Sequence, residues 1–339
     1  MDKRRLTYEA LGHFLDGVVG ARTAYGPMKS EGFHLFGPLS GKKPDLTFPN
    51  TRNAPKNALF KHTETLATFT RTPSGMEYVA DGEEMPEAVL FVRPCDAANL
   101  ALLDKVFGWK PFDDPYYQAR REKTTIVAVA CVKAPYSTCF CTSVGGEPVG
   151  EKNADVLMTD LGDGYLVEFL TEKGQKLAQF AHGEPPASAA DLAGKEEVRK
   201  AAALTVNSTV PARAILPVLK RIFEHPYWAT IHRRCLACGT CTYLCPSCHC
   251  FDIADEVKDE GGARIRSWDS CMYPLFTRET SGHNPRPTQR ERWRQRVMHK
   301  FSYIPENFDE IGCVGCGRCV LNCPVGIDIR SIVEDIAKL

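Results

Sequence analysis

Two copies of one cysteine motif constrain the fold more than any other feature of the 339-residue sequence. Each copy reads Cys-x₂-Cys-x₂-Cys-x₃-Cys-Pro, the first over Cys235–Pro246 and the second over Cys313–Pro324. An iron–sulfur cubane needs four thiolates that point inward, and a tight glycine-containing loop can present three of them while its amides approach the sulfurs. The repeated motif therefore predicts two [4Fe–4S] clusters.

The same spacing also predicts which cysteines share a cluster. In bacterial two-cluster ferredoxins the cysteine before proline ligates the cluster of the other motif, which ties the two loops together. We therefore expect two four-cysteine ligand sets, named site A and site B below. Site A consists of Cys235, Cys238, Cys241 and Cys323, and site B consists of Cys313, Cys316, Cys319 and Cys245.

Two other metal chemistries fit parts of the motif less well. A pair of zinc sites would need a Cys-x₂-Cys pair from each of two places, and gives no reason for three cysteines followed by Cys-Pro. Cys245–His249 also matches the Cys-x-x-Cys-His pattern of covalent haem attachment. We reject haem because Cys245 is needed at site B and no distal ligand is evident.

The distribution of cysteines suggests two domains. Eleven of the fifteen lie between Cys235 and Cys323, so we place a boundary near residue 215. Residues 1–215 predict a mixed α/β domain, with a helix over Tyr8–Val19 and strands over Glu87–Pro94 and Thr125–Val132. Residues 216–339 predict a ferredoxin-like domain, and the fold class is α+β. The segment Gly183–Gly194 reads as a surface loop.

Four cysteines upstream of the motifs define a third candidate, site C: Cys95, Cys131, Cys139 and Cys141. Cys95 and Cys131 lie at the ends of predicted strands, and Asp96 is expected to cap the helix that runs to about Phe107. If the four thiols converge, a third [4Fe–4S] cluster is the natural occupant. The alternative is that some are core thiols and that the others line a flavin or a partner surface, because their spacing matches no standard motif.

A long insertion, residues 247–312, separates the two motifs. It holds the remaining cysteines, Cys248, Cys250 and Cys271, with His249 and His283 nearby. These could form a further metal or thiol site, but buried packing near a cluster is the expectation we prefer. The insertion also holds a basic segment in which Thr288–His299 predicts a capped helix with Glu291 near its start. The arginines of that segment either form a solvated face, line a partner surface or offset the charge of thiolate clusters; they are Arg286, Arg290, Arg292, Arg294 and Arg296.

Composition excludes several classes of function. Lysine plus arginine and aspartate plus glutamate each number 42, so no net charge attracts the chain to nucleic acid or anionic lipid. Apolar runs such as Ala88–Val92 are too short to span a membrane. Because no export signal is convincing and thiols at metal-ligand spacing suit a reducing compartment, we expect a cytoplasmic protein.

Several longer motifs resemble one protein family. They are Val92–Asp96, Asp114–Arg121, Cys139–Cys141, Cys245–Asp252, Trp268–Cys271 and Ser281–Pro287. Together they resemble the beta subunit of soluble hydrogenase/sulfur reductase complexes and the related A-type subunit of anaerobic sulfite reductase, from about residue 85 to the C-terminus. The resemblance implies a cytoplasmic subunit that relays electrons between a flavin subunit binding NAD(P) and a catalytic subunit, with the flavin on the partner. Nothing is recognised in residues 1–80.

These features favour a non-catalytic electron-transfer subunit that passes single electrons through its clusters. One alternative is an iron–sulfur flavoprotein with its own substrate site in the N-terminal domain. The only glycine-rich candidate there, Gly162–Val167, lacks the third glycine and precedes a strand rather than following one. A redox sensor that contacts nucleic acid is disfavoured by the balanced charge and by the lack of a DNA-binding motif.

Overall fold

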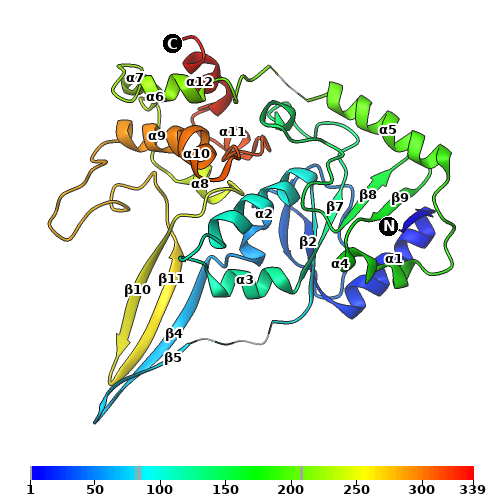
Figure 1. Cartoon of the computed structure of the whole chain (residues 1–339), viewed down its shortest axis with the longest axis horizontal. Helices are drawn as coiled ribbons and strands as arrows, with labels where there is room; N and C mark the ends of the chain where they lie inside the picture. The colour runs from blue at the N-terminus through cyan, green and yellow to red at the C-terminus, as the bar shows by residue number, and fades with distance from the viewer. Residues whose placement is uncertain (1, 81, 83–84, 207–208) are drawn as a thin grey trace.

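The computed structural model describes residues 2–80, 82, 85–206 and 209–339. The chain folds into a large mixed sheet, a smaller sheet that projects as an arm, and a group of short helices around the two cysteine motifs (Figure 1). Within the described ranges no helix is both long enough and apolar enough to span a bilayer. The predicted mixture of helices and sheets with a C-terminal ferredoxin-like domain is confirmed.

The large sheet has the strand order β1-β9-β8-β7-β6-β2-β3. Neighbouring strands are parallel from β2 through β6 and β7 to β8, and antiparallel at both edges. The carboxyl ends of β6 and β7 therefore meet at one edge, where α/β sheets commonly hold ligands. The strands are β1 (Lys3–Leu6), β2 (Thr23–Ser30), β3 (Phe33–Pro38), β6 (Ala88–Val92), β7 (Thr124–Val129), β8 (Val156–Asp160) and β9 (Tyr165–Phe169).

Helices cover both faces of this sheet, because its central strands are apolar on both sides. Along β6, Val89 and Phe91 join a core beneath α1, whereas Leu90 and Val92 join a core beneath α2. Such continuous apolar strands are typical of buried parallel sheets. The helices of this part are α1 (Tyr8–Ala21), α2 (Pro94–Phe107), α3 (Pro115–Glu122), α4 (Glu172–Gln175) and α5 (Ala189–Leu204), with short 3₁₀ turns over Pro55–Ala58, Cys141–Val144 and Ala178–Ala181.

Three local predictions for this region need correction. The helix that follows β6 starts at Pro94 with Arg93 at its cap, so Asp96 lies in the first turn and is not the capping residue. Strand β7 ends at Val129, so Cys131 lies in the following loop rather than at the strand end. The segment predicted as a loop, Gly183–Gly194, enters α5 at Ala189, with Ser188 and Asp191 forming a capping box.

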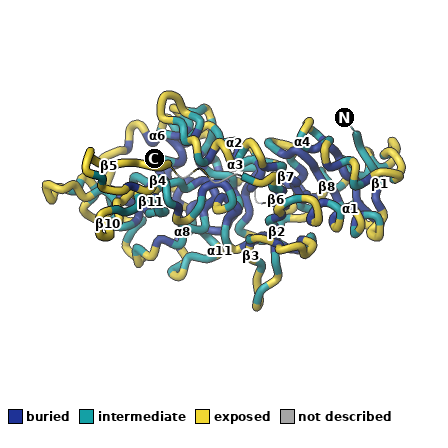
Figure 2. The backbone as a smooth tube through the Cα atoms, turned by 90° about the horizontal axis from the view of Figure 1, so that it is seen from below, coloured by how far each residue is buried: buried dark blue, intermediate teal, exposed yellow. Residues whose placement is uncertain are grey.

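The arm is a four-stranded antiparallel sheet with the order β10-β11-β4-β5. It joins two distant parts of the sequence: β4 (Thr63–Thr72) and β5 (Gly75–Ala80) come from the N-terminal part, whereas β10 (Phe251–Lys258) and β11 (Gly261–Trp268) come from the insertion. All residues of β5 and β10, the two edge strands, are exposed, as the yellow tips in Figure 2 show.

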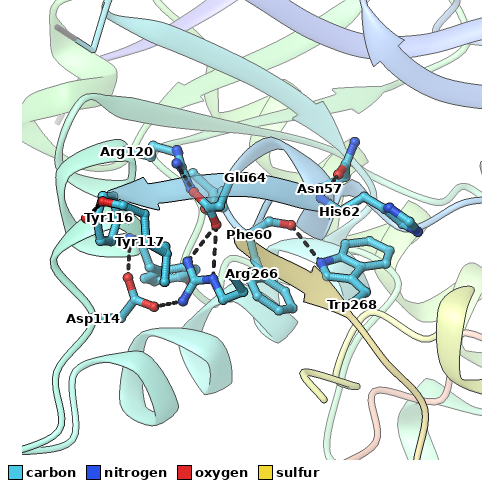
Figure 3. A network of polar contacts seen from close by, with 12 residues as sticks. Asn57, Phe60, His62, Glu64, Asp114, Tyr116, Tyr117, Arg120, Arg266 and Trp268 are labelled. Atoms are coloured by element: carbon cyan, nitrogen blue, oxygen red, sulfur yellow. Dashed lines mark hydrogen bonds and ion pairs between the residues drawn. The ribbon is translucent and has the colours of Figure 1, made fainter. Parts of the chain in front are cut away.

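A buried network of charges fixes the base of the arm (Figure 3). Glu64 of β4 accepts hydrogen bonds from Arg266 of β11, at 2.6 and 3.1 Å, and from Arg120 of α3. Arg266 also pairs with Asp114, the capping residue of α3. Because each buried charge has an opposite partner, the arm is held to the body of the molecule at a defined angle.

The C-terminal helices share a third core with the loop that carries site C. Phe140 and Val144 from that loop pack with Trp228, Trp293, Phe301 and Val333. The predicted basic helix is confirmed as α9, with Thr288 and Glu291 forming its capping box. The elements are α6 (Leu216–Arg221), α7 (Trp228–Ile231), α8 (Thr240–Tyr243), α9 (Gln289–Met298), a π-helical turn (His299–Tyr303), α10 (Ile304–Phe308), α11 (Arg318–Leu321) and α12 (Ile329–Ile336).

Candidate iron–sulfur centres

The two motif loops have the same backbone geometry. Gly239 and Gly317 each precede a one-turn helix, α8 or α11, with φ of 72° and 73°. This left-handed conformation favours glycine and turns the third cysteine of each motif back toward the first two. In both loops an amide donates to the first sulfur: Ala237 N to Cys235 Sγ at 3.4 Å, and Gly315 N to Cys313 Sγ at 3.5 Å. Such N–H···S contacts stabilise thiolate ligands.

The four cysteines predicted for site A line one cavity, between α8, α9 and the loop that precedes α12. Cys238 is the exposed member, whereas the other three are half-buried. Two neutral side chains touch these sulfurs: Gln289 Nε2 donates to Cys235 Sγ at 3.2 Å, and Thr240 Oγ1 lies 3.4 Å from Cys238 Sγ. The backbone of Ile327 donates to Cys323 Sγ at 3.2 Å. Site A therefore lies near the surface, and the charged side chain in its lining is Arg296, which it shares with site B.

The four cysteines predicted for site B line a second cavity, which is enclosed by charged side chains. Lys300 Nζ donates to Cys245 Sγ at 3.3 Å and also to the carbonyl of Gly312 at 2.8 Å. Burial opposes the charge of this lysine, but the thiolates of Cys245 and Cys248 outweigh it and raise the lysine pKa. Lys300 is therefore positively charged at neutral pH and stabilises negative charge at site B.

Arg318 occupies the position directly before the third cysteine of the second motif. Its guanidinium is buried and pairs with Asp96 at 2.7 and 2.8 Å, and it also donates to Asn50 Oδ1 at 2.6 Å. Burial opposes its charge, but Asp96 and Cys316 raise the arginine pKa. Asp96, which was predicted as a helix cap, thus ties α2 and site C to the site B loop.

The four upstream cysteines of site C line a third cavity at the carboxyl edge of the large sheet. Arg93 bridges the loops after β6 and β7 there, donating to the carbonyls of Val129 at 3.1 Å and Ala130 at 2.8 Å. The loop that carries Cys139 and Cys141 is anchored to site B, because Phe140 N donates to the carbonyl of Gly315 at 2.8 Å. The four thiols thus converge on one cavity that adjoins the second motif.

The donor set of site C suits an iron–sulfur cluster. Burial raises the pKa of all four thiols, to about 11 for Cys139 and about 12 for Cys141, and for Cys141 the neighbouring thiolates of Cys131 and Cys139 raise it further. Four such thiolates are stable together only when a cationic centre compensates their charge. In the described part of the chain, no group of three or more His, Cys, Asp or Glu side chains is placed to hold a metal ion.

The three sites adjoin in the order A, B, C. Cys319 and Arg296 line the cavities of both site A and site B. Cys316 lines the cavities of both site B and site C. The backbones of sites B and C also approach each other closely. A Cβ placed on Gly315 of the site B loop would lie only 2.5 Å from the backbone nitrogen of Cys141 at site C. Site B therefore lies between the other two.

Sequence reasoning missed some of the cations that support the sites and anticipated others. Lys56 was missed: it lies on the 3₁₀ turn of the N-terminal part, is almost fully buried, and donates to the carbonyl of Cys248 at 2.6 Å. Arg318 was also missed, although its place inside the motif is a signal that could have found it. Arg296 donates to the carbonyl of Cys241 at 2.8 Å, as the charge-offset hypothesis for the basic helix expects. Arg294 instead pairs with Glu224 at 3.1 Å.

Comparison with known proteins agrees with this geometry. Residues 234–327 match the family model of the 4Fe-4S dicluster domain, which includes every cysteine of sites A and B. The chain is similar, at 29% identity over 98% of its length and 98% of the relative's, to the sulfhydrogenase 2 subunit beta of Pyrococcus furiosus. The resemblance predicted from the motifs is confirmed, and it includes nearly all of the first 80 residues.

Proposed function

Since the chain resembles a sulfhydrogenase beta subunit from end to end and contains a 4Fe-4S dicluster domain, we propose that it is the iron–sulfur electron-transfer subunit of a multisubunit oxidoreductase. It relays single electrons between a subunit that binds flavin and NAD(P) and a catalytic reductase or hydrogenase subunit, in the cytoplasm. In this role no substrate needs to bind the chain.

The observation that carries this proposal is that neighbouring sites share lining residues. Cys319 lies between sites A and B, and Cys316 lies between sites B and C, so adjacent clusters would be separated by a single ligand loop. When bound, the clusters supply one-electron redox chemistry, and their potentials depend on hydrogen bonds, charge and burial. The residues of this chain would hold the clusters and donate N–H hydrogen bonds to their thiolates.

The ligands are proposed as the sequence assigned them. Site A takes Cys235, Cys238, Cys241 and Cys323, site B takes Cys313, Cys316, Cys319 and Cys245, and site C takes a third [4Fe–4S] cluster on Cys95, Cys131, Cys139 and Cys141. The common lining of each cavity by one set of four supports this assignment.

A flavoprotein with its own substrate site is the second candidate, and one cavity favours it. This cavity lies beside Cys95 and Cys313 and is lined further by Gly145 and Gly146. Its charged lining is net acidic, since Glu147, Glu151 and Glu310 face Lys152 alone, and Glu310 already pairs with that lysine at 2.7 Å. An acidic lining repels the phosphate of a flavin nucleotide, so the relay is preferred.

The test is to purify the chain anaerobically and to measure iron, acid-labile sulfide and bound flavin, with EPR spectra of the reduced protein. The relay with three clusters predicts about twelve irons and no flavin, whereas two clusters give about eight. Cys139→Ser should lose about four irons and leave the signals of sites A and B, and the matched control Thr142→Ala should lose none. Stoichiometric zinc or flavin would overturn the proposal.

A further inference from the structure

Three cysteines remain outside the three sites, and two of them meet at the base of the arm. Cys250 directly precedes β10 and Cys271 follows β11, the two strands that pair as a hairpin. The register of β10 and β11 places Phe251 opposite Trp268, and Asp269 N donates to the carbonyl of Cys250 at 3.0 Å. Cys250 and Cys271 are therefore held together by strand pairing, although they lie far apart in sequence.

The contact between these two cysteines is polar. The side chain and the backbone amide of Cys271 interact with the Cys250 thiol and lower its pKa. Cys271 is buried, with 8% of its surface exposed, and Cys250 is half-buried. Two neighbouring thiols of which one has a lowered pKa are suited to forming a disulfide, because the thiolate is the nucleophile in that reaction.

Buried cations support this arrangement. Lys56 and Lys300 lie close enough to Cys250 to stabilise its negative charge, and neither lysine has a carboxylate partner in the described ranges. The hydrogen bonds from Cys271 outweigh the opposing effect of burial and lower the Cys250 pKa to about 7. The same contact raises the pKa of Cys271, so the proton stays on Cys271. The pair thus has a nucleophilic member and a protonated member at neutral pH.

A third thiol links the pair to site B. Cys248 lies near Cys271 and hydrogen-bonds Cys245, the ligand that site B receives from the first motif. Arg296 donates to Cys248 Sγ at 3.4 Å and holds it in this position. Cys248 therefore lies near both the pair and Cys245, the ligand of the central site.

We propose that Cys250 and Cys271 form a redox-active dithiol that exchanges two electrons with the iron–sulfur chain through site B. The proposal rests on the relay function above. On oxidation the S–H bond of Cys271 breaks, its proton passes to solvent, and a Cys250–Cys271 disulfide forms. The two electrons reduce two oxidised [4Fe–4S] clusters, one electron each, and the reverse reaction reopens the disulfide. The chain would then store an electron pair besides carrying single electrons.

The experiment counts electrons and identifies the bond in the full chain with its clusters. Protein oxidised anaerobically with diamide should take up about two more electrons per chain from dithionite than Cys250→Ser or Cys271→Ser protein does. Alkylation, digestion and mass spectrometry should find a peptide pair linked through Cys250 and Cys271 after oxidation and two alkylated cysteines after reduction. Ser281→Ala is the control, because it changes an exposed residue of the same insertion and should leave both the disulfide and the electron count unchanged.

Two results would overturn the dithiol. If Cys250 and Cys271 can still be fully alkylated after oxidation, they are packing thiols. If Cys250→Ser and Cys271→Ser each lose about four irons, the two cysteines are ligands of a further cluster. Failure of the relay itself gives a different result, since wild-type protein would then lack the iron of sites A and B whatever the state of this pair.

Discussion

Sites A and B have the same loop geometry and share Arg296 in their linings, but the side chains that touch their sulfurs differ. The two glycines that turn the loops have φ within one degree of each other. Yet site A is supported by the neutral Gln289 and has an exposed ligand, Cys238, whereas site B is supported by the buried Lys300. The motif fixes how a cluster is bound, and the residues outside the motif fix its charge environment and its place in the electron path.

The position directly before the third cysteine shows the same difference. Site A has Thr240, which accepts a bond from the Cys238 thiol at 3.4 Å, and site B has Arg318, which reaches Asp96 in the other part of the chain. The residue at this position in site A contacts only its own loop, whereas the residue in site B also joins the second motif to the N-terminal part of the chain. We therefore expect equivalent substitutions to have unequal effects.

Removal of one ligand should give the largest effect. Cys316→Ser and Cys238→Ser should each lose about four irons per chain, measured by iron assay and EPR. Because site B lies between the other two, Cys316→Ser should also stop electron transfer between sites A and C, whereas Cys238→Ser should leave sites B and C connected. If site C is still reduced through site A in the Cys316→Ser protein, the linear order of the sites is wrong.

Breaking the ion pair between Arg318 and Asp96 should give the next largest effect, a loss of folding stability. Arg318→Thr copies the residue of site A but leaves Asp96 buried without a partner, so the free energy of unfolding should fall by about 3–5 kcal/mol. Thr240→Ala, at the equivalent position of site A, should cost about 1 kcal/mol or less. Urea unfolding of the cluster-loaded proteins, followed by tryptophan fluorescence, measures both.

A double variant separates the unpaired charge from lost packing. Arg318→Met together with Asp96→Leu removes both charges and should recover part of the stability lost in Arg318→Thr. Equal destabilisation by Arg318→Thr and Thr240→Ala would mean that the Arg318–Asp96 pair does not join the two regions.

The charge of Lys300 should separate the reduction potentials of the two sites. Reduction adds negative charge, which a cation near Cys245 stabilises, so Lys300→Met should lower the potential of site B by about 100 mV, equivalent to about 2 kcal/mol. Gln289→Met removes only a neutral hydrogen bond and should lower the potential of site A by less than half as much. EPR-monitored redox titrations of both variants give the two values, and equal shifts would contradict the electrostatic difference.

The sequence predicted what depends on local spacing and missed what depends on the fold. The cysteine motifs, the capped helix α9 and the apolar strands β6 and β7 each follow from a period or a turn signal within a few residues. Lys56 supports the cysteines of the insertion from the N-terminal part, and no local pattern marks a lysine as buried. The arm was missed for the same reason, since β4 and β11 pair across almost two hundred residues.

Mild acid should weaken the surroundings of site B more than those of site A. His249 and His299 pack against each other, 5.3 Å apart between ring centres, next to residues that support site B, whereas the residues lining site A include no histidine. Burial lowers the pKa of His249 to about 4 and that of His299 to about 3. Below pH 6.5 the unfolded chain binds protons that the folded chain does not, so stability falls from pH 6.5 down to about pH 4.

The variant His299→Gln isolates this effect. It removes one of the two buried imidazoles, so the stability lost between pH 7 and pH 5 should shrink by about 1–2 kcal/mol, measured by urea unfolding at both pH values. In wild-type protein the EPR signal of site B should also disappear at a higher pH than that of site A. A His299→Gln protein with unchanged pH dependence would show that this imidazole gains a proton in the folded state, and the difference in acid sensitivity between the two sites would then need another cause.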